Sequence, residues 1–320
     1  MRHNQEDHTL LHYIIKKVKK HNTDNISRTD AYLQYYLQHP EIKWALIASM
    51  VSRNAGWNMT DLYLSPFQQL FSEKELFKLF MTYERANWLI FSDAYPQLLI
   101  YSQSKLINRP LFHLLKNFRV SLFMIKEWHH FWEYKDKDRL VSSLIINEQN
   151  VIHSPVVKHP YFQLHVFHQM PYFLQNIMSM SAILLPTNKG LYGTYVQGFT
   201  RLTNRIVLGK RIASIMFHPH IYDYVLDYML THEHTGSRKD YERFLNFSFP
   251  YAPVLRLIYP AVSHDDYIRH DWFIQRGLKS KWKSPVTKVD KMEIGSAFYR
   301  KRNILFAYSH LKKALKGKNS

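Results

Sequence analysis

Apolar residues recur along most of the chain at intervals of three and four residues, which is the spacing of one helix face. Ser27 with Asp30 has the spacing of a capping box and predicts a helix that begins at Arg28. Pro96 lies inside a long helical pattern and is predicted to kink or break it. Helices are predicted over residues 10–18, 28–39, 73–101, 111–118, 122–134, 140–151, 162–180, 204–217 and 219–230, and from 237 to 245.

Strand patterns are scarce. The one extended stretch is GLYGTYVQGF, residues 190–199, whose three glycines favour a loop or a short hairpin. The uncharged run 169–188 is interrupted by Pro171 and Pro186, whereas a membrane helix needs roughly 20 mostly apolar residues. We therefore expect a buried helix there and no transmembrane segment. The fold predicted is all-α: a large multi-helix single body with one short extended or hairpin segment near 190–199.

The segment 44–61 has the sharpest change from apolar to polar positions. Residues 44–51, WALIASMV, carry no charge, which is typical of a buried helix. The residues that follow can donate or accept hydrogen bonds, and a buried helix that brings several such groups to one turn can form a binding site. These polar side chains are Ser52, Arg53, Asn54, Trp57, Asn58, Thr60 and Asp61.

The composition is that of a folded protein with a large core. The chain has 320 residues, of which 46% are hydrophobic, 15% are aromatic and only 9 are glycine, so disorder is excluded. Of the net charge of +18, residues 276–320 supply +11, from 13 Lys and Arg against 2 Asp and Glu. This change near Arg276 predicts an all-α helical body over residues 1–275 and a basic C-terminal extension over 276–320 that is helical in part.

Cysteine is absent, which excludes disulfides, cysteine-ligated zinc, iron–sulfur clusters and cysteine nucleophiles. The N-terminal sequence MRHNQEDHTLLHYIIKKVKK lacks the longer apolar region and the small-residue cleavage site of a signal peptide. We therefore expect a cytoplasmic protein, with which the lack of cysteine is compatible.

Histidine is abundant, at 19 residues, but no complete set of metal ligands is present. Glu127 and His130 form the E-x-x-H pair that di-iron bundles use twice, and no second pair is suitably placed. The densest group of possible ligands is HDDYIRHD, residues 264–271, and surface positions at the start of a helix are the alternative. We expect neither a metal nor another cofactor.

His234, Ser237 and Arg238 belong to the sequence HTGSRKDY, in which a glycine turn precedes a predicted helix. Free backbone amides at a helix start, together with the guanidinium of Arg238, favour an anion. The alternative is a purely structural cap that pairs Ser237 with Asp240.

Asn147 and Glu148 follow the apolar run 140–146 and form either a satisfied buried network or part of a site. Glu148 and Asp61 are the candidate catalytic acids or bases. Alternatively, either carboxylate neutralises Arg53, because a buried arginine without a partner is costly.

Five segments resemble the YppC family of bacterial proteins, a family with a domain of unknown function. The resemblance extends from about Asn25 to at least Tyr241, and it implies no activity, ligand, cofactor or catalytic residue. The segments are NISRTDAYLQYYLQHPEIKWA, SRNAGWNMTDL, ANWLIFSDAYPQLLIY, LIINEQ and HTGSRKDY.

Three functions remain open on the sequence. A polar pocket could bind or act on an anionic, phosphate- or carboxylate-bearing small molecule, and convergence of Arg53, Asn147, Glu148 and Arg238 in one cavity would favour this. The basic tail, residues 276–320, could instead bind nucleic acid or an anionic membrane surface. A scaffold or interaction protein without chemistry would expose a large apolar patch.

Overall fold

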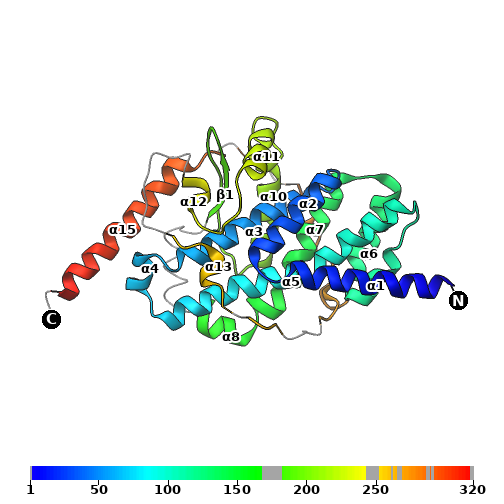
Figure 1. Cartoon of the computed structure of the whole chain (residues 1–320), viewed down its shortest axis with the longest axis horizontal. Coiled ribbons are helices and arrows are strands. Elements are labelled where there is room, and N and C mark those ends of the chain that lie inside the picture. The colour runs from blue at the N-terminus through cyan, green and yellow to red at the C-terminus, as the bar shows by residue number, and fades with distance from the viewer. Residues whose placement is uncertain are drawn as a thin grey trace.

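The structure is a computed structural model that describes residues 2–167, 182–242, 252–260, 262–264, 269–285, 289 and 292–317. Nearly all of the regular structure is helical, which confirms the all-α fold (Figure 1). The helices are α1 (Arg2–His21), α2 (Asn25–Gln38), α3 (Lys43–Asp61), α4 (Ser65–Leu70), α5 (Glu73–Leu106), α6 (Leu122–Tyr134), α7 (Lys137–Val151), α8 (Pro160–Phe162), α10 (Leu202–Met216), α11 (Tyr222–Thr231), α12 (Lys239–Glu242), α13 (Leu255–Ile258), α14 (Trp272–Arg276) and α15 (Gly295–Gly317). Short 3₁₀ or π turns cover Phe112–Phe118, His153–Val157, Gln163–Phe167 and Ser280–Trp282.

Helix α3 occupies the centre of the molecule (Figure 1). It is buried on all sides, and its apolar half includes Trp44, Leu46 and Met50, each at most 1% exposed. Helix α2 packs along it, and α5, α7 and α10 contact its other faces. A helix that is buried all round must satisfy its polar side chains within the protein, and most polar residues of its second half find partners on other elements.

The start of α2 corrects one prediction. Asp24, rather than Ser27, caps the helix, because its carboxylate accepts a hydrogen bond from the backbone N–H of Ser27 at 2.6 Å. Aspartate is as good an N-cap residue as serine, and here it also pairs with Arg256 from a distant part of the chain. The helix therefore begins at Asn25, three residues before the predicted start.

Helix α5 runs from Glu73 to Leu106 through Pro96, so the predicted break is absent. Proline removes one backbone hydrogen bond from a helix. The turns around it, however, are among the most buried of the protein: Phe91, Leu98 and Ile100 have no exposed surface. Packing on both sides of Pro96 thus maintains a helix that its sequence alone would interrupt.

A hairpin is the only sheet among the described residues. Strand β1 (Ala182–Thr187) pairs antiparallel with β2 (Gly190–Tyr195), which confirms the hairpin predicted near 190–199. The buried helix predicted over 169–188 is wrong at 182–187, which form β1, and its earlier part lies outside the described residues, as does most of the predicted helix 162–180. Gly193 has φ +142°, and a Cβ there would meet the carbonyl oxygen of Ile183, so the pairing requires glycine at this position.

The side chain of Asn54 joins this hairpin to α3. Its Oδ1 accepts from the N–H of Leu184 at 2.7 Å, and its Nδ2 donates to the carbonyl of Leu184 at 2.8 Å. The amide thus pairs with β1 as a neighbouring strand would, and it satisfies two buried backbone groups at once.

The basic segment after Arg276 contributes to the core. Trp282, Phe298 and Tyr299 are at most 3% exposed, and the N–H of Ile294 donates to the carbonyl of Leu191 on β2. Helix α15 therefore begins against the hairpin, and its later turns project away from the body (Figure 1). A division of the chain near residue 276 stays a prediction.

Among the described residues, no helix combines the length and the apolar composition needed to cross a membrane.

We predict that Asn54→Leu lowers the free energy of unfolding by about 2–5 kcal/mol, because the N–H and C=O of Leu184 lose their partners in the core. Equilibrium denaturation in urea measures the change. The matched control is Asn117→Leu, where an exposed amide bonds only to a carbonyl of its own helix turn. Equal losses in the two variants would contradict the role of Asn54.

Candidate functional site

A cavity of about 180 Å³ lies between α3, α5, α7 and α10, with β1 closing one side. Its walls are largely apolar: Val51 and Ala55 come from α3, and Ile90 from α5. Few polar side chains reach it. They are Asn58, Thr82, Tyr83, Asn87, Glu148, Gln149 and Arg205.

A glycine allows α7 and α10 to approach each other beside the cavity. A Cβ at Gly209 would lie 2.7 Å from Cγ2 of Ile145, so a larger residue would push the helices apart. The same Cβ position lies 3.8 Å from Oε1 of Glu148, so the close crossing also fixes the wall next to that carboxyl group.

Glu148 is the one acidic side chain of the cavity wall. Its Oε2 accepts from the indole Nε1 of Trp44 at 3.0 Å, and its Oε1 accepts from Nε2 of Gln149 at 3.0 Å. Both donors are neutral, and among the described residues Glu148 forms no ion pair. Burial raises the pKa of Glu148 to about 7, so at neutral pH the group can either donate or accept a proton.

Arg205 extends this polar wall. Its Nε donates to Oε1 of Gln149 at 2.9 Å and its Nη1 to the carbonyl of Phe199 at 2.7 Å, and the side chain is 2% exposed. Trp44, Glu148, Gln149 and Arg205 therefore form one hydrogen-bonded chain, in which Glu148, Gln149 and Arg205 make up the polar wall of the cavity.

Arg205 is not among the site residues predicted from the sequence, although its position carries a signal. Arg205 belongs to a stripe with Leu208, Gly209 and Ile212, spaced as one face of a helix. An arginine in such a stripe must be satisfied inside the protein, and all four residues line the cavity.

Arg53 lies away from the cavity. Its Nη1 donates to the carbonyl of His232 at 2.9 Å, and the guanidinium is 5.5 Å from the ring centroid of Tyr228. The expected pairing of Arg53 with Asp61 or Glu148 is therefore wrong. The side chain turns towards the end of α11, where a carbonyl group and an aromatic face stabilise its charge.

Asp61 instead pairs with two arginines. Nε and Nη2 of Arg238 donate to its two oxygens at 2.8 and 2.9 Å, and Nη2 of Arg302 on α15 donates at 2.6 Å. Burial alone would raise the pKa of Asp61, but the charges of Arg238 and Arg302 outweigh it and hold the pKa below the ordinary value. An ionised, fully bonded carboxylate is suited to structure rather than to proton transfer.

The sequence HTGSRKDY forms a network of internal contacts. Asp240 accepts from the indole N–H of Trp57 at 2.9 Å and contacts Nδ1 of His234 at 3.3 Å, while the hydroxyl of Ser237 donates to the carbonyl of Ala252. Burial lowers the pKa of His234 to about 4, so this imidazole is neutral at pH 7. The contacts favour a structural role for this segment over the anion site, but the role is not the predicted Ser237–Asp240 cap, because the two side chains bond to Ala252 and to Trp57 and Thr235.

Asn147 belongs to another buried network, which joins α7 to α5, to the start of α6 and to α14. Its Nδ2 donates to Asp93 at 2.6 Å, and its Oδ1 accepts from Ser121 and from the indole of Trp272. Of the four residues whose convergence was to favour an anionic pocket, Glu148 lines the cavity, while Arg53, Asn147 and Arg238 do not. Asn58 is the other predicted site residue on the cavity wall.

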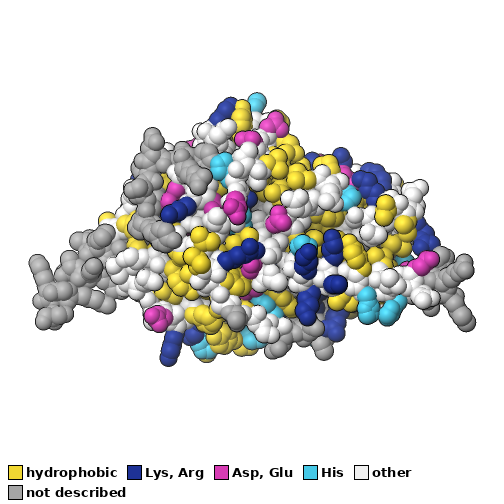
Figure 2. Space-filling view, viewed as in Figure 1, with side chains coloured by type: hydrophobic (Ala, Val, Ile, Leu, Met, Phe, Trp, Pro, Cys, Tyr) yellow, Lys and Arg dark blue, Asp and Glu magenta, His cyan; other side chains and the backbone are white. Residues whose placement is uncertain are grey.

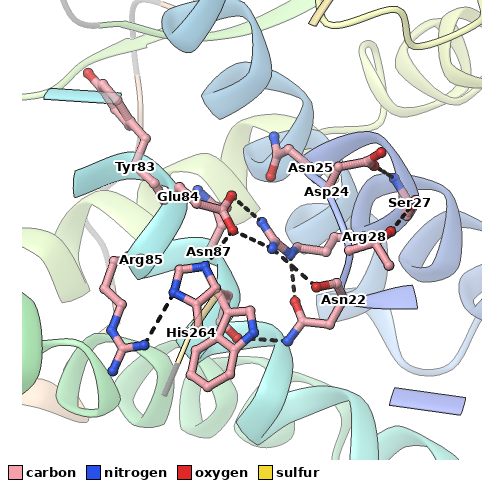
Figure 3. A network of polar contacts seen from close by, with 12 residues as sticks. Asn22, Asp24, Asn25, Ser27, Arg28, Tyr83, Glu84, Arg85, Asn87 and His264 are labelled. Atoms are coloured by element: carbon pink, nitrogen blue, oxygen red, sulfur yellow. Dashed lines mark hydrogen bonds and ion pairs between the residues drawn. The ribbon is translucent and has the colours of Figure 1, made fainter. Parts of the chain in front are cut away.

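The structure describes only some of the possible metal ligands in residues 264–271. Nε2 of His264 lies 2.8 Å from Glu84, which forms a two-pronged ion pair with Arg28 (Figure 3). Figure 3 shows the imidazole of His264 between Glu84 and Arg85. Residues 265–268 lie outside the described part of the chain, within which no three His, Asp or Glu side chains are grouped for a metal.

A wider groove of about 710 Å³ runs beside α6, α7 and α10, and its buried acid, Glu127, already has a cation as its partner. Glu127 accepts from Arg139 at 2.7 and 2.9 Å, and Lys210 donates to the carbonyls of Trp282 and Ser284. The cavity beside Glu148 is therefore the better candidate, because its acidic group has no charged partner.

Comparison with known proteins gives a family without an assigned role. A family model described as "Protein of unknown function (DUF2515)" matches residues 20–298. A relative, "Uncharacterized protein YppC" of Bacillus subtilis (strain 168), is 46% identical over 266 residues, which cover 82% of this chain and 83% of the relative. These matches confirm the resemblance found in the sequence. No solved structure matches the chain.

We predict that Glu148→Gln becomes more stable relative to the wild type as the pH rises from 4 to 8. The folded-state pKa of Glu148 is above its ordinary value of 4.5, so the stability due to its protonated form is lost as the pH rises towards about 7. The difference corresponds to at most about 3 kcal/mol. Denaturant unfolding at several pH values measures it.

The control for this measurement is Glu133→Gln, at an exposed position of α6. It should change stability by less than about 0.5 kcal/mol at every pH. A stability difference between Glu148→Gln and the wild type that does not vary with pH would show that Glu148 is not buried as described.

Proposed function

The chain belongs to the DUF2515 family, and we propose that it binds a compact, largely apolar small molecule in the cavity between α3, α5, α7 and α10. The observation that carries this proposal is the cavity itself, whose apolar walls surround one unpaired carboxyl group, Glu148. Ligand sites in proteins are commonly built in this way, from apolar walls and a few fixed polar groups.

The size of the cavity limits the ligand. An engineered protein cavity of about 150 Å³ holds a benzene molecule. The present cavity, at about 180 Å³, therefore suits a single ring or a short branched chain with one small substituent. Nucleotides and sugar phosphates are too large for it and would leave their charges against apolar walls.

A catalytic role for Glu148 remains within this proposal. Its pKa near 7 is the value at which a general acid or base works best at neutral pH. The polar wall supplies one such group, and Asp61, the other candidate, is held by Arg238 and Arg302. We therefore propose binding first, with Glu148 as the group that would transfer a proton if a reaction follows.

The location and the remaining functions are proposals as well. The absence of cysteine is compatible with the cytoplasm.

A scaffold role is less favoured, because hydrophobic side chains are interspersed with polar ones on the face shown in Figure 2.

Binding of a polyanion has one observation in its favour. The later turns of α15 project from the body (Figure 1), and the sequence has Lys312, Lys313 and Lys316 there. Separately, Figure 2 shows Lys and Arg side chains gathered over α1. Arg302, however, is 5% exposed and bonded to Asp61, so not every basic residue of the tail is available.

We predict that small apolar molecules such as toluene, indole and benzyl alcohol raise the melting temperature of the wild type, because they bind the folded state. Ala86→Phe should abolish this effect, since Ala86 lines the cavity and a phenyl group would fill it. Differential scanning fluorimetry with increasing ligand concentration gives the measurement.

The matched control is Ala213→Phe, which lies on α10 in the wide groove outside the cavity. It should keep the ligand-induced shift of the wild type. No shift with any molecule, or equal shifts in Ala86→Phe and wild type, would rule out the cavity as a binding site.

We predict that removal of residues 308–320 weakens binding to DNA, RNA or anionic vesicles, if the tail is a polyanion site, because it removes Lys312, Lys313, Lys316 and Lys318. This cut spares the buried Phe298, Tyr299 and Arg302. Binding measured across a salt series decides the matter. Unchanged affinity after truncation would exclude the end of α15 as the site.

A further inference from the structure

Glu148, on the polar wall of the cavity, has no cation beside its carboxyl group in the described part of the chain, and this suggests the charge of the ligand. Glu148 receives hydrogen bonds from Trp44 and Gln149, both neutral, at 3.0 Å each. A buried carboxylate without a cation is costly, and neutral donors offset only part of that cost. A ligand that fills the cavity keeps water away from Glu148, so a ligand that carries a cation offsets a cost that a neutral ligand leaves in place.

The groups nearest to Glu148 on the neighbouring helices α2, α3, α5 and α7 include no cation that pairs with its carboxyl group. Trp44 is on α3 and Gln149 on α7, while Gly209 of α10 brings no side chain. On α2, the hydroxyl of Tyr32 is buried without a hydrogen-bond partner, and burial, with the charge of Glu148 next, raises the pKa of Tyr32. On α5, Tyr83 is the titratable side chain of the cavity wall.

Arg205 is the cation of the cavity wall, but its hydrogen bonds hold it in place. Nε, Nη1 and Nη2 donate to the side chain of Gln149, the carbonyl of Phe199 and the carbonyl of Gln149. With 2% of its surface exposed, it presents little area to a ligand. Glu148 lies on the same cavity wall and has only two neutral donors among the described residues, so its charge has no comparable set of partners.

We infer that the ligand carries a basic nitrogen, which binds as a cation against the ionised carboxylate of Glu148 while its apolar part fills the cavity. This inference rests on the proposed function, because it names the ligand class of the same cavity. The N⁺–H group donates to Oε1 or Oε2, each of which can accept a second hydrogen bond.

Binding of this kind exchanges a proton. In the empty site burial raises the pKa of Glu148 to about 7, so at pH 6 most molecules hold a carboxylic acid. A cationic ligand pairs with the carboxylate, and the proton of Glu148 passes to the buffer. At pH 8.5 the carboxylate is already ionised and no proton is released.

Three probes of nearly equal size separate the possible charges of the ligand: benzylamine, benzyl alcohol and benzoate. Isothermal titration calorimetry of the full chain at pH 8.5 should give benzylamine an affinity at least about tenfold higher than that of benzyl alcohol, with benzoate weakest. At pH 6 the binding enthalpy of benzylamine should depend on the ionisation heat of the buffer, with close to one proton released.

The results distinguish the inference from the proposed function. The claim that the ligand carries a basic nitrogen is overturned if benzyl alcohol binds as tightly as benzylamine, or if benzoate binds most tightly. Either result leaves the proposal of a binding cavity standing. Benzoate as the best probe would restore the anionic ligand that the sequence suggested, with Arg205 as its partner. If none of the three probes binds, both the inference about the ligand and the proposal that the cavity is a binding site are overturned.

Glu148→Gln tests the residue directly. The variant should lose at least about tenfold in affinity for benzylamine and should keep its affinity for benzyl alcohol within about threefold. Glu133→Gln, at the exposed position of α6, should leave all three affinities unchanged. Equal loss for the amine and the alcohol would mean that the variant damages the cavity, and the comparison of the three probes on the wild type would then decide alone.

Discussion

Burial of charge is the constraint on which the packing of this protein depends. Asp61 at the end of α3 accepts from Arg238 and from Arg302, and Glu84 on α5 accepts from Arg28 on α2. Such pairs add little net stability compared with apolar residues of the same shape, but loss of one partner costs about 3–5 kcal/mol. Their main effect is therefore to fix which segments meet: the arginines on Asp61 lie 177 and 241 positions away in the sequence.

The same constraint explains how a central helix can have polar residues. Helix α3 has no exposed side chain, and most polar groups of its second half reach another element. Asn54 reaches β1, Trp57 reaches Asp240, and Asp61 reaches α15. The polar residues 52–61, which resemble a binding site in the sequence, thus mostly form hydrogen bonds and ion pairs that hold the hairpin and α15 to the central helix.

This accounts for what the sequence could and could not predict. Helix periodicity depends on neighbouring residues, and it placed α5, α7 and α10 correctly. Glu148 and Asn58 were singled out because polar residues next to an apolar run are visible locally. Partners across the fold are not visible, so Arg53 was paired with the wrong groups.

Arg205 and the strand 182–187 show the same limit. Arg205 was overlooked because its role depends on Gln149 and Phe199, which come from two other segments. The apolar run 182–187 suits a helix or a strand equally, and the contact with Asn54, 130 positions away, belongs to the strand.

Glu148 differs from these arginine-paired acids, and it lies on the cavity wall. Where Asp61 and Glu84 have arginines, Glu148 has an indole, an amide and open space. The glycine at 209 brings α10 close to α7 at this point without adding a side chain that could fill the space or bond to the carboxyl group. Among the described residues Asp240 also lacks a cation, but Trp57 and Thr235 donate three hydrogen bonds to it. An acid that has only two neutral donors and faces a cavity, as Glu148 does, has the arrangement expected when a further partner arrives from outside the chain.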